Sequence, residues 1–218
     1  MGYHWIPYAI VAYLLGSVPF GKFIARGVGR IDITTRGSRN IGATNVAREL
    51  GLKWGFLTLV LDILKGFVPV VLFASYIPDT AHSHEIALPL VGLSALLGHQ
   101  FSLFERFRGG KGAATALGIF LGIAPLSSLL AICLFILVVY KWNIVSLGSM
   151  ISASAMPFFL VLFHTPQPLV IFSLVVAALI LIKHKDNIRR LLRGEETKWR
   201  NRTTHPRSSR SLSNSSSE

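Results

Sequence analysis

Long apolar blocks separated by short polar stretches constrain this chain more than any other feature of its sequence. The blocks cover residues 4–25, 54–77, 86–104, 113–140, 143–163 and 168–183. Most are long enough for a helix to cross the roughly 30 Å hydrocarbon core of a bilayer. Only 15% of the residues are charged, whereas soluble domains carry about a quarter. The sequence therefore predicts an all-α polytopic integral membrane protein.

The distribution of Lys and Arg orients these blocks. The stretch between the first two blocks, residues 105–111 and the tail after Lys183 are all basic, whereas residues 78–85 contain no Lys or Arg. Because Lys and Arg accumulate on the cytoplasmic side, we expect the basic segments inside and residues 78–85 outside. The N-terminus is then outside and the C-terminus cytoplasmic. The first block lacks a cleavage-site pattern, so we expect a retained span and not a signal peptide.

This orientation requires the block 113–140 to cross the membrane twice. A single crossing would leave the basic tail outside. A turn near Gly122 and Pro125 would divide the block into two helices, both shorter than the roughly 17 residues of an ordinary span. Such spans need a locally thinned bilayer or burial within the bundle. We therefore expect about seven transmembrane helices, two of them short.

The chain divides into a membrane-embedded domain, residues 1–196, and a polar tail, residues 197–218. The tail is rich in Ser, Arg and Asn without apolar periodicity, a composition typical of disorder. The net charge of +12 fits cytoplasmic Lys and Arg in a membrane protein better than binding to nucleic acid. The lone cysteine, Cys133, lies in an apolar run and cannot form an intramolecular disulfide.

A first polar motif runs from Gly37 to Arg48 and has the composition of an anion site. Its glycines allow backbone N–H groups to approach an anion, and the Arg48 guanidinium offers a fixed fork of donors. Its neutral donors are Ser38, Asn40, Thr44 and Asn45. The same residue types also cap helices, so an ordinary loop leading into a helix is the alternative.

A second motif, Gly98 to Thr115, places glycines around Lys111 at the start of an apolar block. The pattern is that of a phosphate cradle, but Gly112 follows the lysine where a Walker A loop has Ser or Thr, so ATP hydrolysis gains no support. The alternative is a basic connector at lipid head groups. His99 shares a helix face with a serine three residues later, and such a histidine is more often a packing residue than a base.

A third motif covers His184 to Glu196 and puts His184 and Asn187 on one helix face. Its arginines fit an amphipathic helix lying on anionic lipid; they are Arg189, Arg190 and Arg193. Inside the second block, Asp62 and Lys65 are costly in lipid unless paired. Because they are three residues apart, we expect them to form an ion pair.

All three motifs lie on the predicted cytoplasmic side, which favours an anionic, membrane-associated substrate. A transporter or channel for a phosphorylated solute would use the same basic groups, but its site must open to both sides. A membrane serine protease lacks support because no GxSxG is present. A metal site at His82, His84 and Glu85 lacks HExxH spacing.

Taken together, the motifs resemble the bacterial acyl-phosphate-dependent glycerol-3-phosphate acyltransferases, the PlsY family. The similarity runs along nearly the whole chain, in GSVPFG, GSRNIGATNVAR, LDILKG, GHQFSLFERFRGGKGAAT and HKDNIRRLLRGEE. One departure is Arg39, where the family typically has a glycine. The resemblance implies seven spans in the bacterial inner membrane and an active site that faces the cytoplasm.

The resemblance also implies residue roles. The expected catalytic residues are Ser38, Arg48, Lys111, His184 and Asn187. The expected substrate-binding residues are Asn40, Thr44, Asn45, His99, Gly109, Gly110, Gly112 and Thr115. The first set would line the glycerol-3-phosphate site, and the loop from Gly109 to Thr115 would hold the phosphoryl group of acyl phosphate.

The implied reaction transfers an acyl group from acyl phosphate to the 1-position of glycerol-3-phosphate, giving lysophosphatidic acid and inorganic phosphate for phospholipid biosynthesis. It needs no cofactor, metal or covalent acyl-enzyme, because the donor is an activated mixed anhydride. The leaving phosphoryl group or His184 would accept the proton, and we favour the former. The expected partners are the two substrates and membrane lipid, without nucleic acid, and a monomer is consistent with this picture.

Overall fold

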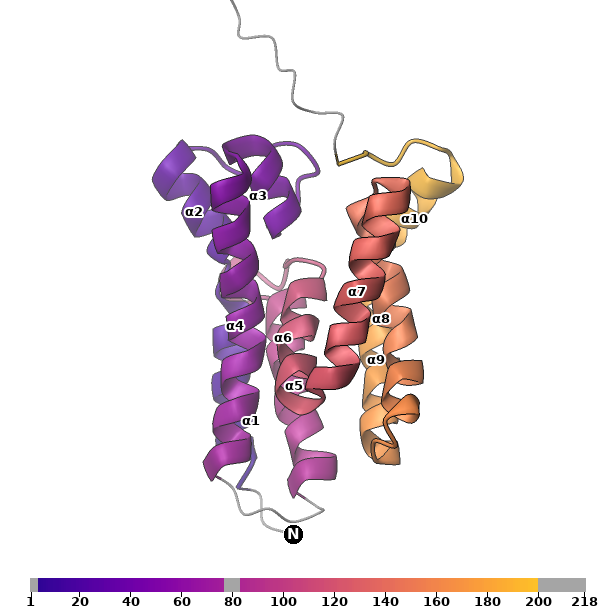
Figure 1. The fold of residues 1–218 in the computed structure, drawn as a ribbon. Coiled ribbons are helices and arrows are strands. Elements are labelled where there is room, and N and C mark those ends of the chain that lie inside the picture. Colours follow the sequence, from indigo (N-terminus) through magenta and orange to yellow (C-terminus); the bar gives the residue numbers. More distant parts are fainter. Residues whose placement is uncertain (1–3, 77–82, 200–218) are drawn as a thin grey trace, which may run out of the picture.

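The computed structural model describes residues 4–76 and 83–199, and every regular element in these ranges is a helix (Figure 1). The α-helices are α1 Ile6–Ser17, α2 Phe20–Gly29, α3 Ala43–Leu50, α4 Leu52–Tyr76, α5 Leu88–Gln100, α6 Ala113–Ile123, α7 Pro125–Trp142, α8 Val145–Leu162, α9 Gln167–Lys183 and α10 Lys185–Leu192. A π-helical turn, η1 (Ser83–Ala87), precedes α5, and a 3₁₀ turn, η2 (Leu103–Glu105), follows it.

Several of these helices are long and apolar enough to cross a membrane. Among the described residues, five segments meet this test by length and composition, and they are Ile6–Gly29, Leu52–Tyr76, Glu85–Glu105, Pro125–Trp142 and Val145–Leu162. Helices α9 and α10 meet it as a pair with a 63° bend between them, and α6 is a shorter apolar helix. The described part of the chain thus has the multi-pass helical architecture that the sequence predicts.

The predicted break inside the block 113–140 is confirmed. Helix α6 ends at Ile123, Ala124 leaves the helical region with φ −144° and ψ 75°, and Pro125 begins α7. The expectation that both halves are short is wrong, because α6 has 11 residues but α7 has 18. Helix α7 continues past the apolar block to Trp142, where the Lys141 ammonium lies 4.6 Å from the indole centroid. This end can reach the polar interface while its charge stays hydrated.

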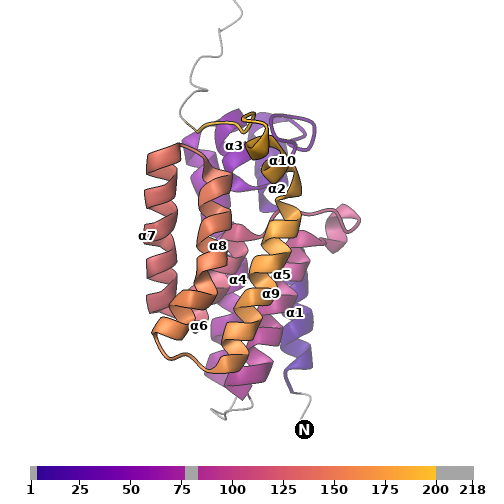
Figure 2. The ribbon, with the colours of Figure 1, turned by 90° about the vertical axis from the view of Figure 1, so that its right-hand side faces the viewer.

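The short polar helices gather at one end of the bundle. Helices α2, α3 and α10 lie together at the top of Figures 1 and 2, and the start of α1 lies at the opposite end. The first and third polar motifs therefore share one end of the molecule. The connector between α5 and α6, which carries the second motif, lies directly below them (Figure 1).

Glycines allow α4 and α6 to pack at backbone contact. A Cβ atom added at Gly118 would lie 2.0 Å from the Ile63 carbonyl oxygen, and one at Gly66 would lie 2.2 Å from the Thr115 carbonyl oxygen. Such small-residue crossings are typical of membrane helices, whose association depends on close van der Waals packing because lipid provides no hydrophobic drive. Helices α1 and α5 meet through glycines in the same way.

These contacts predict the effect of adding one methyl group. Gly118→Ala or Gly66→Ala should lower the thermal unfolding midpoint in detergent, with a cost of about 1–3 kcal/mol typical of overpacking. Gly27→Ala in α2 is the matched control, because a Cβ there meets nothing within 4 Å and alanine favours the helix by up to about 1 kcal/mol. Equal midpoints for all three variants would contradict the close packing of α4 on α6.

Candidate active site

The first polar motif is a loop built around the buried side chain of Asn45. Its amide nitrogen donates to the carbonyl oxygens of Ile33 (3.3 Å), Arg36 (3.1 Å) and Asn40 (2.9 Å). Its side-chain oxygen accepts the backbone N–H of Ser38 at 2.9 Å. Asn45 thus organises the loop from within, and the exposed Ser38 lies on its outer side.

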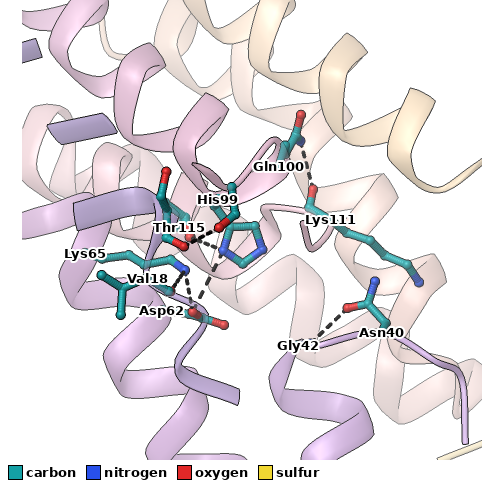
Figure 3. Close-up of polar contacts among 11 residues, drawn as sticks. Val18, Asn40, Gly42, Asp62, Lys65, His99, Gln100, Lys111 and Thr115 are labelled. Atoms are coloured by element: carbon teal, nitrogen blue, oxygen red, sulfur yellow. Dashed lines mark hydrogen bonds and ion pairs between the residues drawn. The ribbon is translucent and has the colours of Figure 1, made fainter. Parts of the chain in front are cut away.

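The backbone of this loop explains why a glycine, which the resembled family typically has, would suit the position of Arg39. Arg39 has φ +58°, in the left-handed region that glycine adopts without a steric cost. Gly37 has φ +53° in the same loop. Asn40 accepts the backbone N–H of Gly42 at 2.9 Å (Figure 3), and Thr44 follows, half-buried, in the first turn of α3. The arginine therefore leaves the turn in place.

The glycine-rich connector of the second motif packs closely against the C-terminal end of α5. The backbone N–H of Gly110 donates to the His99 carbonyl oxygen at 3.0 Å, and the Gln100 side chain donates to the Lys111 carbonyl oxygen at 2.9 Å (Figure 3). A Cβ at Gly109 would lie 2.1 Å from the His99 carbonyl oxygen, and one at Gly110 would lie 2.2 Å from His99 Nε2. Close packing thus requires glycine here, whatever the connector binds.

The Lys111 side chain joins this connector to the third motif. Its Nζ donates to Asn187 Oδ1 at 2.5 Å, and Asn187 Nδ2 donates to Glu196 Oε1 at 2.6 Å. Glu196 also accepts from Ser146 Oγ and from Arg190 Nε, each at 2.6 Å. A continuous hydrogen-bonded chain therefore runs from the α5–α6 connector through α10 to the N-terminal turn of α8.

Two members of this chain, Ser146 and Glu196, are absent from the predicted site. Glu196 ends the HKDNIRRLLRGEE motif, and its place near several arginines is the sequence signal that could have indicated its part in the site. Ser146 has no such signal, because it lies within an apolar block. Arg190 differs from its predicted place on the lipid surface, since it turns inward to Glu196, whereas Arg189 is exposed and lies 3.3 Å from Asp186.

His184 lies one residue beyond α9 and is almost fully buried. Its Nδ1 is 2.8 Å from the Ile180 carbonyl oxygen, which can only accept, so Nδ1 carries the hydrogen. Burial, and after it the nearby charge of Lys111, lower the His184 pKa to about 4. The imidazole is therefore neutral near pH 7, with an unprotonated Nε2 that can accept a proton.

Burial also changes the titration of Lys111 and Glu196. The Lys111 pKa is lowered to about 8; burial is the largest cause, the charges of Arg190 and Arg48 act in the same direction, and the charge of Glu196 opposes them. For Glu196, burial alone would raise the pKa, but hydrogen bonds from Ser146, Arg190 and Asn187 bring it below the usual range. Near pH 7 the site thus combines an ammonium, two guanidinium groups and one carboxylate.

A strap formed by residues 194–199 connects the motifs at this end of the molecule. An Arg48 side-chain nitrogen donates to the Thr197 carbonyl oxygen at 3.2 Å, and the Trp199 N–H donates to the Asn143 carbonyl oxygen at 2.8 Å. Thr197 and Trp199, the first and third residues of the predicted tail, therefore contact the helical bundle. The tail after Trp199, and His82 of the metal alternative, lie outside the described residues.

The structure brings only part of the predicted site together. Lys111 and Asn187 are in contact, Arg48 lies near enough to lower the pKa of Lys111, and Lys111 lies near enough to lower the pKa of His184. His99 and Thr115 lie instead in the interior, where His99 Nδ1 is 3.1 Å from Thr115 Oγ1 (Figure 3). The predicted ion pair of Asp62 and Lys65 is confirmed, with 2.9 Å between the two charged groups.

Comparison with known proteins gives one consistent result. The glycerol-3-phosphate acyltransferase family model matches residues 6–194. The glycerol-3-phosphate acyltransferase of Geotalea daltonii is 49% identical over 187 residues, which cover 86% of this chain and 93% of the relative. That of Geobacter sulfurreducens is 47% identical over 193 residues, which cover 87% and 95%.

Two solved structures share the fold. They are crystal structures of PlsY (YgiH), an integral membrane glycerol 3-phosphate acyltransferase, in its glycerol 3-phosphate form and its lysophosphatidic acid form. Their TM-scores are 0.83 and 0.81, and each is 36% identical over 89% of this chain and 94% of the solved chain. With this agreement in sequence, length and fold, the chain belongs to the PlsY family of integral membrane glycerol-3-phosphate acyltransferases.

Proposed function

We propose that the protein transfers an acyl group from acyl phosphate to the 1-position of glycerol-3-phosphate, giving lysophosphatidic acid and inorganic phosphate for phospholipid biosynthesis. The observation that carries this proposal is the contact of Lys111 with Asn187, which joins the glycine-rich connector to α10. It places a buried ammonium between two of the polar motifs. Family membership supports the same activity, since solved relatives are described in glycerol 3-phosphate and lysophosphatidic acid forms.

The charges of the site suit two anionic substrates that repel each other. The Lys111 ammonium and the Arg48 guanidinium can offset that repulsion, and the backbone N–H groups of the connector add neutral donors. Glu196 fixes the Asn187 amide, so that its oxygen faces Lys111 and its nitrogen faces the carboxylate. Substrate phosphate would replace Asn187 as the partner of Lys111 or bind beside it. Holding both reactants in this orientation is the main contribution of the protein.

The chemistry needs neither a protein nucleophile nor a cofactor. A hydroxyl of glycerol-3-phosphate attacks the acyl carbon, the bond from that carbon to the phosphate oxygen breaks, and inorganic phosphate leaves. Because the substrate hydroxyl attacks the acyl carbon directly, no covalent acyl-enzyme forms, and the hydroxyl proton passes to the departing phosphoryl group. Neutral His184 offers a second acceptor at Nε2. Ser38, exposed on the Asn45-centred loop, supplies a hydroxyl that orients glycerol-3-phosphate.

We further infer seven spans, in which α6 is a short crossing, with the N-terminus outside and the C-terminus in the cytoplasm. The basic polar segments support this orientation, and α3 and α10 gather at one end of the bundle (Figure 1). The active site then faces the cytoplasm from the bacterial inner membrane. Residues 1–196 form the acyltransferase domain of a monomer, and the polar remainder to residue 218 forms a tail.

Donor choice is the direct test of this function. Purified protein in detergent is given glycerol-3-phosphate with palmitoyl phosphate, palmitoyl-CoA or palmitoyl acyl carrier protein, and lysophosphatidic acid and free phosphate are measured. Of the three donors, we expect only palmitoyl phosphate to give product. One phosphate should be released for each lysophosphatidic acid formed. If only palmitoyl-CoA gave product, the proposed donor would be wrong. If no donor gave product, the proposed activity would be wrong.

Removal of the Lys111 ammonium should abolish catalysis without unfolding the protein. Lys111→Ala is expected to reduce kcat/KM for glycerol-3-phosphate by at least about 100-fold, because a charged hydrogen-bond partner contributes roughly 3 kcal/mol in a buried site. Lys141→Ala removes an exposed lysine at the end of α7 and serves as the control. Ser38→Ala should also inactivate. Retained activity of Lys111→Ala, with the wild-type unfolding midpoint, would contradict the site.

The lowered pKa of Lys111 predicts an alkaline limit for substrate binding. Its ammonium is charged below about pH 8 and loses its charge above that value, so kcat/KM for glycerol-3-phosphate should fall as the pH rises through 8. Lys111→Arg keeps a positive charge at every accessible pH and should lose this decline, although its rate is lower. Both proteins are assayed with the same donor stock, which corrects for donor hydrolysis. The same decline in Lys111→Arg would exclude Lys111 as its source.

A further inference from the structure

Below the connector, α4, α5 and α6 enclose a buried polar cluster that has no direct part in the proposed chemistry. It consists of Asp62, Lys65, His99 and Thr115, each at most 5% exposed. Asp62 Oδ1 lies 2.9 Å from Lys65 Nζ and 3.8 Å from His99 Nδ1, and that same Nδ1 lies 3.1 Å from Thr115 Oγ1 (Figure 3). Lys65 also donates to the carbonyl oxygen of Val18, just after α1, at 3.0 Å.

Net stability is a poor explanation for this cluster. Burying an ion pair roughly balances its attraction against the loss of hydration, and apolar side chains of the same volume usually serve as well. The α4–α6 contact already depends on glycines at backbone distance. A buried polar network does, however, fix the orientation of each of its members.

The orientation that this network fixes is that of the His99 ring. The Asp62 carboxylate favours a hydrogen on Nδ1, which faces Thr115. The opposite ring edge, at Nε2, then faces Gly110, where an added Cβ would lie only 2.2 Å away. The His99 carbonyl oxygen accepts the Gly110 N–H at 3.0 Å. The connector therefore packs directly against His99 at Gly110, which is one residue before Lys111.

We propose that Asp62, His99 and Thr115 are positioning residues, which hold the connector of residues 109–112 so that Lys111 meets Asn187 across the site. The expected effect on kinetics rests on the proposed function, whereas the expected effect on the structure of the connector does not. The three residues touch neither substrate. They act by fixing the position of the Lys111 ammonium. Their loss should therefore raise the KM for glycerol-3-phosphate more than it lowers kcat.

Thr115 separates positioning from packing. Thr115→Val keeps the shape and removes the hydroxyl, whereas Thr115→Ser keeps the hydroxyl and removes the methyl group that packs near Gly66. If Thr115 only fills space, Val is tolerated and Ser is destabilised. If it positions His99, Val is the impaired variant and Ser keeps most of the activity. Thr58→Val is the matched control, because Thr58 is a buried threonine of α4 that donates only within its own helix.

Hydrogen exchange and kinetics on the full-length protein in detergent test the proposal. In Thr115→Val we expect amides of residues 108–112 to exchange at least about tenfold faster, with unchanged exchange in α9. The KM for glycerol-3-phosphate should rise about tenfold, with a smaller change in kcat. Thr115→Ser and Thr58→Val should exchange like the wild type. His99→Asn, which keeps an amide near Thr115 but removes the ring edge at Gly110, should match Thr115→Val.

The two measurements separate this inference from the function beneath it. Wild-type exchange and kinetics in both Thr115→Val and His99→Asn would overturn the positioning role even if the wild type is fully active. A wild type that forms no lysophosphatidic acid from any donor would instead overturn the proposed function. Faster exchange of residues 108–112 in the two variants would then still support the structural role of the cluster.

Discussion

The hydrogen bond from Lys111 to Asn187 is the contact on which the organisation of the site depends. It joins two segments that are 76 residues apart and are carried by different helix pairs. On one side, the connector between α5 and α6 must present the ammonium. On the other, Glu196 must hold the Asn187 amide with its oxygen toward that ammonium. The lysine is buried enough for its pKa to fall to about 8, so its charge is sensitive to every group around it.

The membrane explains how the bundle supports such a site. In lipid, backbone polar groups must be satisfied within helices, and helices associate through close packing instead of a hydrophobic drive. Gly66 and Gly118 provide that packing for α4 and α6. Polar side chains in the bundle are costly, and the cluster around Asp62 and His99 lies next to the connector (Figure 3). The costly groups thus lie next to the connector whose place the proposed mechanism requires to be fixed.

Local features of the chain were predictable, and those that depend on distant contacts were not. The break between α6 and α7 followed from charge parity and a proline, and the ion pair of Asp62 and Lys65 followed from their spacing on one helix. The length of α7 was underestimated, because a helix can carry Lys141 into the interface beyond its apolar block. The inward turn of Arg190 was missed, because only the fold brings Glu196 back toward α10.

The sequence by itself determined the multi-pass helical character of the chain and its family, because hydropathy and motif order are properties of short stretches of chain. It also supplied the residue types that an anionic substrate requires. Only the tertiary structure decided which of them share a surface. The resemblance assigned Asn45, His99 and Thr115 to substrate binding; in the structure Asn45 bonds to the backbone of its own loop, and His99 and Thr115 bond to each other. Ser146 joined the site from an apolar block, since helix packing alone determines which side chains a buried carboxylate meets.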